Sequence, residues 1–520
     1  MGQPAITDRF MTYQTMIKKL ADFFAAQELD VFLVGGFVRN LVLSRPQDRD
    51  IDLAVGGDAA AIAADLATVL GGALVPLSLE RSMMRIVVPA NDDAPDSPFS
   101  DYSGGQAGNE AGGHAGAWTI DLTGFSGGIE EDLARRDFSV NAMAVALSSW
   151  EEWASLDALI DPLGGRADLA RKCIRALGPG IFESDPGRLL RAMRLSSQLR
   201  FRLEPETVRL LASESHRLAQ VSPDRVREEF FRILSLDGAK AQLEAMDRLG
   251  LFQQIIPELQ AAKGVDQPRM HYWDVWGHTL HAVETAELVT KGHRHSPIYS
   301  CVPWTAESEE YFNQPATDGY SRGTVLKLAA LFHDVAKPQT KTTDESGRTR
   351  FFGHSEQGAE IATNRLKELH VSSRGINMVA KMVEQHLRPT NMMDGDDWPT
   401  NRAIHRYFRD VDDVAIDTLY LCLADYLAAK GPELSHSDWL NHARMVAHIL
   451  HVGTNEPVSP TTTRLVTGHD LMTHFNLKPG PYIGSLLEDI EEARAAGEIE
   501  TQGQALELAA QALLHRGDSD

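Results

Sequence analysis

Two aspartates near the start of the chain are spaced so that their carboxylates can act together. Asp50 and Asp52 flank Ile51 at the beginning of an apolar stretch, 51–55, that has the pattern of a short buried strand. Residues two apart on a strand point to the same face, so both carboxylates converge on one point. Oxygen ligands placed in this way suit Mg²⁺, and a third acid, Asp121, lies on another predicted strand and would complete the cluster.

A glycine pair upstream of these acids has the spacing of a phosphate-binding turn. Gly35 and Gly36 separate the predicted strand 31–34 from a helix that begins near Phe37. Glycines here let backbone N–H groups approach a triphosphate, and Arg39 adds a positive charge in the first helical turn. Taken singly, such a pair is more often a plain tight turn, and D-x-D is more often a solvated edge. The order of the elements favours a nucleotide-binding unit.

Histidines and aspartates in the second half of the chain form a further candidate metal site. They follow the order H…HD…D on predicted helices, and imidazole with carboxylate suits a transition metal or Mg²⁺. The residues are His278, His333, Asp334 and Asp425. The alternative is that these histidines are hydrogen-bonded residues in the core of an inert helical body.

The acidic pair and the glycine turn belong to a predicted α/β head over residues 1–147. Strands are expected at 31–34, 51–55, 84–88 and 118–122, and helices at 36–43, 58–70 and 131–147. The stretch 91–117 is rich in Gly, Asp and Ser, which predicts a flexible insertion between two strands.

The remainder of the chain is predicted to be helical. A neck and body are expected at 148–265, a second helical block at 266–430 with an irregular insertion at 291–322, and a helical tail at 431–520. The predicted fold class is therefore α+β, with a small mixed-sheet head followed by all-helical domains.

Composition limits the setting in which the protein works. No stretch approaches the ~20 apolar residues of a membrane span, and three scattered cysteines exclude a disulfide framework, so a cytoplasmic location is expected. The net charge of −23 is unusual for a protein that binds RNA, but arginines are concentrated between Arg188 and Arg232. Neither RNA binding nor a solvated helix face is excluded by this pattern, and the sequence leaves the oligomeric state undetermined.

Several segments in the first half of the chain resemble one known family. The segments are LVGGFVRN, DRDIDLAV, EEDLARRDFSVNAMA, LIDPLGGRADL, FESDPGRLLRAMRLSSQLRF and RVREEFFRIL, between residues 33 and 234. In this order they resemble the class II tRNA nucleotidyltransferases and bacterial poly(A) polymerases, whose head belongs to the DNA polymerase β superfamily. The resemblance implies two-metal nucleotidyl transfer, with Asp50 and Asp52 as the Mg²⁺ ligands.

The same resemblance implies the residues that hold the incoming nucleotide. Gly35, Gly36 and Arg39 match the triphosphate-binding turn, and the next segment contributes Arg136, Asp137 and Asn141. Two positions depart from the family pattern, which usually has Asp at Asn40 and Glu at Ser184. Asn40 removes a charge beside Arg39 but can still accept a hydrogen bond.

Asp185 and Arg188 match the family's template for the incoming base. Residues three apart lie on one side of a helix, where the alternative is a minor surface ion pair. Cytosine and adenine both present an amine donor beside a ring-nitrogen acceptor, so a carboxylate and a guanidinium recognise them and reject guanine and uracil. Arg191 and Arg194 continue this face and would hold phosphates.

The H…HD…D set resembles the HD phosphohydrolase superfamily. His354 and His386 fall where extra ligands or phosphate contacts occur in that superfamily. The resemblance implies a divalent transition metal or Mg²⁺ at this site, and it leaves open whether the domain hydrolyses phosphoesters or is only a scaffold.

These patterns predict an enzyme that adds CMP and AMP from CTP and ATP to the 3′ end of tRNA. A poly(A) polymerase, or an enzyme that adds only CC or only A, remains an alternative, because the base-reading pair accepts both bases. A rival of another class is an HD phosphohydrolase whose head has become a nucleotide sensor.

Overall fold

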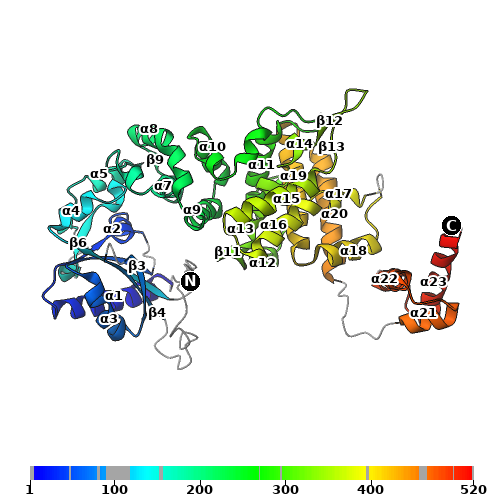
Figure 1. The fold of residues 1–520 in the computed structure, drawn as a ribbon, viewed down its shortest axis with the longest axis horizontal. Coiled ribbons are helices and arrows are strands. Elements are labelled where there is room, and N and C mark those ends of the chain that lie inside the picture. Colours follow the sequence, from blue (N-terminus) through cyan, green and yellow to red (C-terminus); the bar gives the residue numbers. More distant parts are fainter. Residues whose placement is uncertain are drawn as a thin grey trace. The chain divides into compact units, whose positions relative to one another are not determined.

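A computed structural model of the chain (Figure 1) describes residues 5–45, 49–78, 82–89, 117–150, 156–268, 270–292, 295–393, 397–455, 465–495 and 497–517. The chain divides into two compact units, Met1–Leu236 with Gln242–Ile255, and Asp237–Ala241 with Ile256–Asp520. The predicted flexible insertion lies outside the described residues, except for Ala117. Within the described ranges, no helix combines the length and the apolar character that crossing a membrane requires.

The first unit is organised around a seven-stranded mixed sheet with the order β3-β4-β5-β2-β1-β6-β7. β2 and β5 run parallel, and the other neighbouring strands are antiparallel. Apolar side chains such as Leu33, Ile51 and Ile120 are completely buried. The strands are β1 (Val31–Val34), β2 (Asp50–Gly56), β3 (Ala73–Ser78), β4 (Met83–Val88), β5 (Trp118–Phe125), β6 (Ala144–Ala146) and β7 (Leu159–Ile160). The predicted mixed-sheet head is confirmed, and β7 extends the sheet beyond residue 147.

The prediction of one helix over 131–147 is wrong. Helix α4 (Ile129–Ala134) ends early, a 3₁₀ turn follows at Ser139–Asn141, and Ala144–Ala146 forms β6 beside β1. An alanine-rich segment has helical propensity, but pairing with a buried strand overrides that weak preference. β3 is absent from the predicted strands, because its residues are exposed or half-buried and its apolar side chains do not alternate with polar ones.

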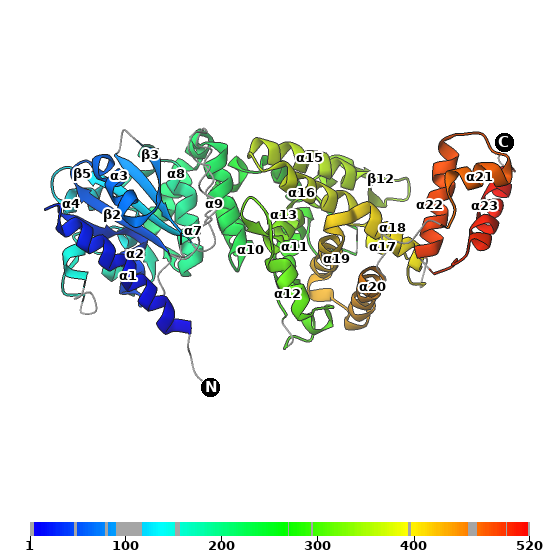
Figure 2. The ribbon, with the colours of Figure 1, turned by 90° about the horizontal axis from the view of Figure 1, so that it is seen from below.

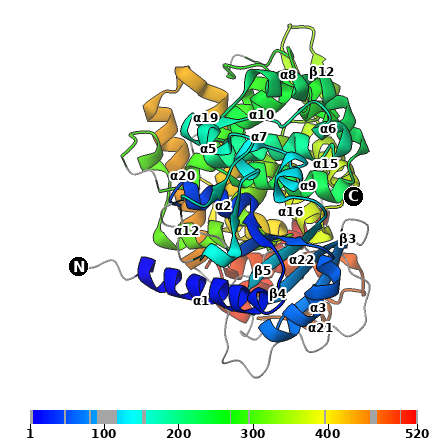
Figure 3. The same cartoon turned by 90° about the vertical axis from the view of Figure 1, so that its left-hand side faces the viewer.

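Helices cover the sheet and orient the residues of the candidate site. α2 (Gly35–Val42) connects β1 to β2, and α3 (Ala59–Leu70) packs on β3, β4 and β5. α1 (Ala5–Ala25) contributes Tyr13, whose ring centroid lies 5.3 Å from that of Phe37 and 5.4 Å from that of Trp118. Figure 3 shows α1 and α3 alongside β4 and β5.

The rest of the first unit is mainly helical, as predicted. The helices are α5 (Gly165–Ala170), α6 (Ile181–Ser184), α7 (Arg188–Leu199), α8 (Pro205–Glu214), α9 (Pro223–Ser235) and α10 (Ala239–Arg248), of which α10 runs across the division between the units. A short pair, β8 (Cys173–Ile174) and β9 (Arg202–Leu203), accompanies them. α7 packs against α9, so the arginines of α7 lie close to the acids of α9.

The second unit is a helical assembly in which α11 packs between α13 and α19, and α13 contacts α16 (Figure 2). Its helices up to residue 455 are α11 (Val275–Val289), α12 (Ala306–Asn313), α13 (Arg322–Phe332), α14 (Lys337–Thr340), α15 (His354–Glu368), α16 (Ser373–Gln385), α17 (Arg388–Asn391), α18 (Asn401–Val411), α19 (Ala415–Lys430) and α20 (His436–Asn455). Two hairpins are present, β10 (Pro315–Thr317) with β11 (Tyr320–Ser321) and β12 (Lys341–Thr343) with β13 (Thr349–Phe351). The predicted irregular insertion at 291–322 therefore contains α12 and the first hairpin.

The tail forms a small helical cluster with its own apolar core. It consists of α21 (Gly468–Phe475), α22 (Pro481–Ala495) and α23 (Gln502–Gly517). Val466, Leu471, Leu486 and Ile490 are among the buried residues of this core. The contact between α22 and α18 includes an ionic cluster, in which the Glu492 carboxylate accepts hydrogen bonds from the guanidinium groups of Arg402, Arg406 and Arg409.

Candidate functional sites

The three head carboxylates lie in neighbouring rows of the sheet. On β2, Asp50 pairs in register with Thr119 and Asp52 with Asp121 of the parallel strand β5. Burial, followed by the negative charge of Asp121, raises the pKa of Asp52 above its ordinary value. A bound cation would stabilise the ionised form of a carboxyl group that is otherwise costly to ionise beside other acids. The donor atoms of this acidic group are all oxygens. The donor set therefore fits a hard divalent ion.

A partner of Asp121 was missed by the sequence analysis. Arg85 on β4 binds Asp121 in a fork, with Nε 2.7 Å from Oδ1 and Nη2 2.8 Å from Oδ2. The register places the two residues directly opposite each other on β4 and β5. Period-2 patterning identifies strands but does not say which strand becomes a neighbour, so this pair had no signal in the sequence.

The glycine turn lies directly against the acidic pair. Gly35 has φ +69°, and a Cβ atom at this position would lie 2.5 Å from Asp52 Oδ2. The positive φ and the absence of space both require glycine. Backbone and carboxylate therefore approach each other as closely as a site for a metal-bound triphosphate needs.

Arg39 is held by amide oxygens. Its Nη1 donates to Asn141 Oδ1 at 3.0 Å, and Nε and Nη2 donate to Asn40 Oδ1 at 3.2 and 3.0 Å. All three side chains are buried. Asn40, which departs from the family pattern, thus still braces the arginine through a neutral acceptor.

Other predicted nucleotide-binding residues are held in ion pairs near Asp52. Arg136 bonds Asp132 at 3.0 Å, and Asp137 pairs with Arg191 of α7 at 2.9 Å. The positive charges of Arg136 and Arg191 also act on Asp52, which they favour in its ionised form. The structure therefore places Arg136 and Arg191 close enough to Asp52 to act on its charge.

Asp185 and Arg188 do not share a helix, which corrects the sequence interpretation. Asp185 follows α6 in an extended conformation, with φ −152° and ψ 94°, and α7 begins at Arg188. Pro186 disfavours the helical conformation for the residue before it, and Gly187 lies just outside α7 as its N-cap. The carboxylate of Asp185 therefore projects from a bend between two helices.

The partner of Asp185 is Arg225, at the beginning of α9. Arg225 Nη2 lies 3.0 Å from Asp185 Oδ2, whereas Arg188 Nε is 4.0 Å from the same atom. Burial alone would raise the pKa of Asp185, but the hydrogen bond and charge of Arg225 outweigh it and lower the pKa. Arg194 is likewise bound to α9, through Glu229 at 2.6 Å. α9 thus fixes residues that the sequence analysis had assigned to α7 alone.

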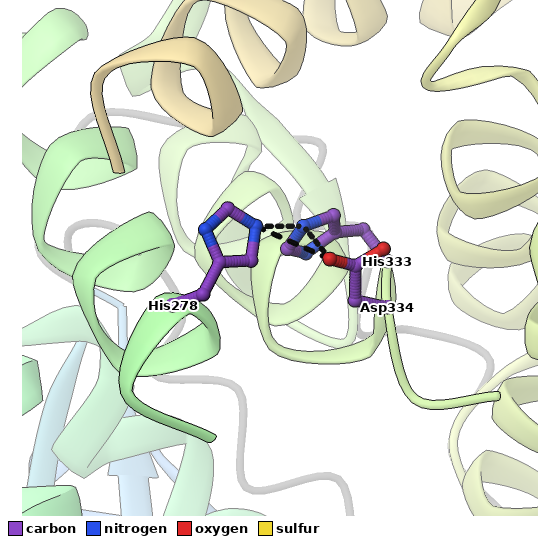
Figure 4. A group of neighbouring side chains, drawn as sticks. All are labelled: His278, His333 and Asp334. Carbon is purple, nitrogen blue, oxygen red and sulfur yellow. Dashed lines mark hydrogen bonds and ion pairs between the residues drawn. The ribbon is translucent and has the colours of Figure 1, made fainter. Parts of the chain in front are cut away.

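The second candidate site lies in the interior of the helical unit. His278 Nε2 lies 3.0 Å from His333 Nε2 and 3.2 Å from Asp334 Oδ2 (Figure 4). It also lies 3.0 Å from Asp425 Oδ1. These side chains come from α11, from the residues that follow α13 and from α19. All four predicted residues meet at one point.

Backbone carbonyls orient three histidines toward this point. The Nδ1 atoms of His333, His354 and His386 lie 2.8, 2.7 and 2.7 Å from the carbonyl oxygens of Ala330, Phe351 and Val383, respectively. An Nδ1–H that donates to a carbonyl leaves Nε2 as a lone pair, which is the tautomer that binds metal. Among the described residues, His354 Nε2 and both oxygens of Asp334 make ion-pair contacts but no hydrogen bond of good geometry. The donor set fits a divalent cation.

Asp334 belongs to two overlapping groups of potential ligands. One group contains His278, His333 and Asp334, and the other contains Asp334, His354 and His386. Burial lowers the pKa of His333, but Asp334 and Asp425 outweigh it and raise the pKa to about 10. Positive charge is therefore stabilised here. Lys337 Nζ supplies some of it, 2.6 Å from Asp334 Oδ2.

Comparisons with known proteins cover nearly the whole chain. Family models match residues 31–175 (poly A polymerase head domain), 200–263 (RNA and SrmB-binding site of polymerase A), 275–430 (HD domain) and 447–510 (tRNA nucleotidyltransferase domain 2). The A-adding tRNA nucleotidyltransferase of Deinococcus radiodurans is 31% identical over 479 residues, which are 91% of this chain and 93% of the relative. The chain belongs to the tRNA nucleotidyltransferase family. It is therefore an enzyme of the nucleotidyltransferase class.

Other members of the tRNA nucleotidyltransferase family show the same extent of similarity. The CC-adding enzyme of Thermus thermophilus is 31% identical, with 92% of each chain covered. A Thermotoga maritima CCA-adding enzyme in complex with tRNA has the same fold, with a TM-score of 0.57, 20% identity, and 96% and 95% of the two chains covered. Head and HD domains of these families generally use divalent metal ions.

Proposed function

We propose that this enzyme completes the 3′ end of tRNA by adding CMP and AMP from CTP and ATP, with release of pyrophosphate. The observation that supports this most strongly is the acidic pair Asp50 and Asp52 on β2, with Gly35 of the glycine turn against Asp52 and with Arg136 and Arg191 close enough to act on the charge of Asp52. Relatives of similar length add CC or add A, and others are named multifunctional CCA proteins, so the nucleotide specificity is the part to be tested.

The residues of the head have distinct tasks in this reaction. Asp50 and Asp52 would hold Mg²⁺, which supplies charge neutralisation for the phosphates and lowers the pKa of the RNA 3′-hydroxyl. Gly35 and Gly36 offer backbone N–H groups to the triphosphate, and Arg39 adds a fixed charge. Sugar, base and phosphate would be held by the remaining residues of the site, Arg136, Asp137, Asn141, Arg191 and Arg194.

Base selection is assigned to Asp185 and Arg188. The carboxylate accepts from the exocyclic amine of cytosine or adenine, and the guanidinium donates to the ring nitrogen. Arg225 keeps the Asp185 carboxylate ionised and fixed in direction, so it acts on the base through Asp185. A carbonyl group, as in guanine or uracil, would face the carboxylate unfavourably.

The decisive test is incorporation of each labelled nucleoside triphosphate onto tRNA that lacks its terminal CCA, with products resolved by length. Two additions from CTP followed by one from ATP support the proposal. A long ladder from ATP alone would identify a poly(A) polymerase, and addition of only C or only A would identify a specialised enzyme. Absence of all addition would shift the working site to the HD domain.

The HD site supports a second activity, hydrolysis of phosphate esters. His278, His333, Asp334 and Asp425 would hold a divalent transition metal or Mg²⁺, and His354 and His386 would extend the site around Asp334. Metal content by mass spectrometry and hydrolysis of p-nitrophenyl phosphate with added Mn²⁺, Ni²⁺ or Mg²⁺ test it. No bound metal and no hydrolysis would leave this domain as a scaffold.

The proposed division of labour follows four segments. They are a head at 1–147, a neck and body at 148–265, an HD domain at 266–430 and a tail at 431–520. A tRNA substrate supports a cytoplasmic location.

A further inference from the structure

One row of side chains crosses three strands of the head and contains two acidic residues and one arginine. Asp52 on β2 is in register with Asp121 on β5, and Asp121 is in register with Arg85 on β4. Residues in register on neighbouring strands project from the same face of a sheet. Arg85 is therefore part of the surface that presents the acidic pair, although no sequence motif includes it.

The Arg85–Asp121 pair has the geometry of a strong, bidentate ion pair. Both carboxylate oxygens of Asp121 accept a hydrogen bond, at 2.7 and 2.8 Å, from two nitrogens of one planar guanidinium group. Such forked, charge-assisted pairs are stronger than single hydrogen bonds and fix the direction of both groups. The side chains are 33% and 23% exposed, so solvent does not replace the bonds easily. A metal ion that recruited Asp121 would first have to break this fork.

The charge of Arg85 reaches beyond its partner. Asp50 and Asp52, as well as Asp121, act electrostatically on the Arg85 guanidinium group. By the same interaction, Arg85 reduces the negative potential that the acidic row offers to a divalent cation. Removal of this one positive charge would strengthen the attraction for a cation, and removal of the ion pair as a whole would leave the net charge unchanged.

We propose that Arg85 is a positioning residue that restricts the metal site of the head to Asp50 and Asp52. It commits Asp121 to an ion pair, and it keeps the affinity for a divalent ion low until the triphosphate of a nucleotide brings further negative charge. Metal and nucleotide then enter the site together. This inference rests on the proposed nucleotidyl-transfer function of the head.

Binding of Mn²⁺, measured by electron paramagnetic resonance on the full chain without nucleotide, tests the proposal without reference to turnover. Subtracting the Mn²⁺ bound by an Asp50→Asn/Asp52→Asn variant separates binding by the head from binding by the HD site. We expect Arg85→Gln to tighten Mn²⁺ binding by roughly tenfold. The charge-balanced double variant Arg85→Gln/Asp121→Asn should bind Mn²⁺ with nearly the wild-type affinity. Added CTP should reduce the difference in Mn²⁺ affinity between Arg85→Gln and the wild type.

Three comparisons make the outcome decisive. Asp52→Asn gives the loss expected of a true ligand, so an equal loss in the Arg85→Gln/Asp121→Asn variant would show that Asp121 binds the metal and would overturn the proposal. Unchanged affinity in Arg85→Gln would overturn it as well. Arg85→Lys keeps the positive charge but not the fork, and it serves as the second variant if Arg85→Gln does not fold. It should bind Mn²⁺ with the wild-type affinity. Tighter binding of Mn²⁺ by Arg85→Lys would contradict the charge argument.

A matched control and an internal check complete the design. Arg365 forms a similar fork with Glu258 in the helical unit, with Nε 3.1 Å from Oε2 and Nη2 2.6 Å from Oε1, and Arg365→Gln should leave Mn²⁺ binding by the head unchanged. If the wild type and Asp50→Asn/Asp52→Asn bind equal amounts of Mn²⁺ even with CTP, the head has no metal site. In that case the proposed transfer function itself fails, which is a different result from failure of the Arg85 proposal alone.

Discussion

The head and the HD domain each gather carboxylates around a point, but they surround that point in different ways. In the head, Asp52 is influenced by acids of the sheet and by Arg136 and Arg191, and the neighbouring Arg85–Asp121 pair is partly open to solvent. In the HD domain, three imidazoles are aligned by backbone carbonyls, and His278, His333 and Asp334 are almost completely buried. A rigid nitrogen-rich cage suits an ion that remains bound, whereas an oxygen pair beside a glycine turn suits an ion that arrives with a triphosphate.

The largest effect should follow loss of an acid of the head. Asp52→Ala removes a proposed metal ligand, which is also an acid on which the charges of Arg136 and Arg191 act. Because a catalytic metal is worth several kcal/mol, we expect nucleotide incorporation to fall by about 10³-fold or more. Hydrolysis by the HD domain should be unaffected in the same preparation. Loss of both activities together would contradict the independence of the two sites.

The converse variant should affect only the second site. His333→Ala removes an imidazole from the centre of the HD cluster, and we expect metal content and any hydrolysis to fall by roughly 10- to 100-fold. Primer extension on tRNA should remain near the wild-type rate. Asn391→Ala, a change on the exposed end of α17, provides a control for effects on the helical unit. A loss of metal in this control would argue against a specific site.

Base selection should respond in two steps. Asp185→Ala removes the acceptor for the exocyclic amine, and a charged hydrogen bond of this kind is worth about 1.5–3 kcal/mol. The preference for CTP and ATP over UTP and GTP should therefore fall by roughly 10- to 100-fold. Arg225→Gln leaves the carboxylate in place but less well directed, so the loss should be only a few-fold. Equal selectivity in all three proteins would remove Asp185 from base reading.

The smallest effect concerns pH and the joint between α18 and α22. Burial would raise the pKa of Glu492, but hydrogen bonds from Arg406, Arg409 and Arg402 outweigh it and lower the pKa to about 2. Because the folded value lies below the ordinary 4.5, the ionised carboxylate stabilises the joint above pH 4.5 and loses this effect as pH falls toward 2.

The variant Glu492→Gln isolates this contribution. Its melting temperature should lie below that of the wild type at pH 6, by an amount equivalent to about 1 kcal/mol, and the two melting temperatures should converge as pH falls to about 2. Glu488→Gln alters an exposed acid of the same helix and should have little effect at either pH. A constant difference between wild type and Glu492→Gln across this range would exclude ionisation as the cause.

The sequence predicted the positions of the candidate site residues better than the residues that hold them in place. Strand pattern and motif order located Asp50, Asp52 and the glycine turn, and the order H…HD…D located four side chains that do meet. Local rules failed where distant segments decide the structure. β6 became a strand because β1 was available to pair with it, and Pro186 broke the helix expected to carry Asp185.

The partners Arg85 and Arg225 also could not be predicted from the local sequence. Each lies on an element that is distant in sequence from the acid it binds, 36 residues for Asp121 and 40 for Asp185. Nothing in the local spacing of either arginine distinguishes it from a solvated charge. Only the strand order and the packing of α9 bring these charges to their acids.

The separate core of the tail has a consequence for how the protein melts. Val466, Leu471 and Ile490 pack with one another, and the tail meets α18 through charges. Cooperative unfolding requires that parts share buried apolar surface, and an ionic contact couples them only weakly. We expect a calorimetric scan to resolve the tail as a transition of its own, which salt moves away from the main transition by screening the joint.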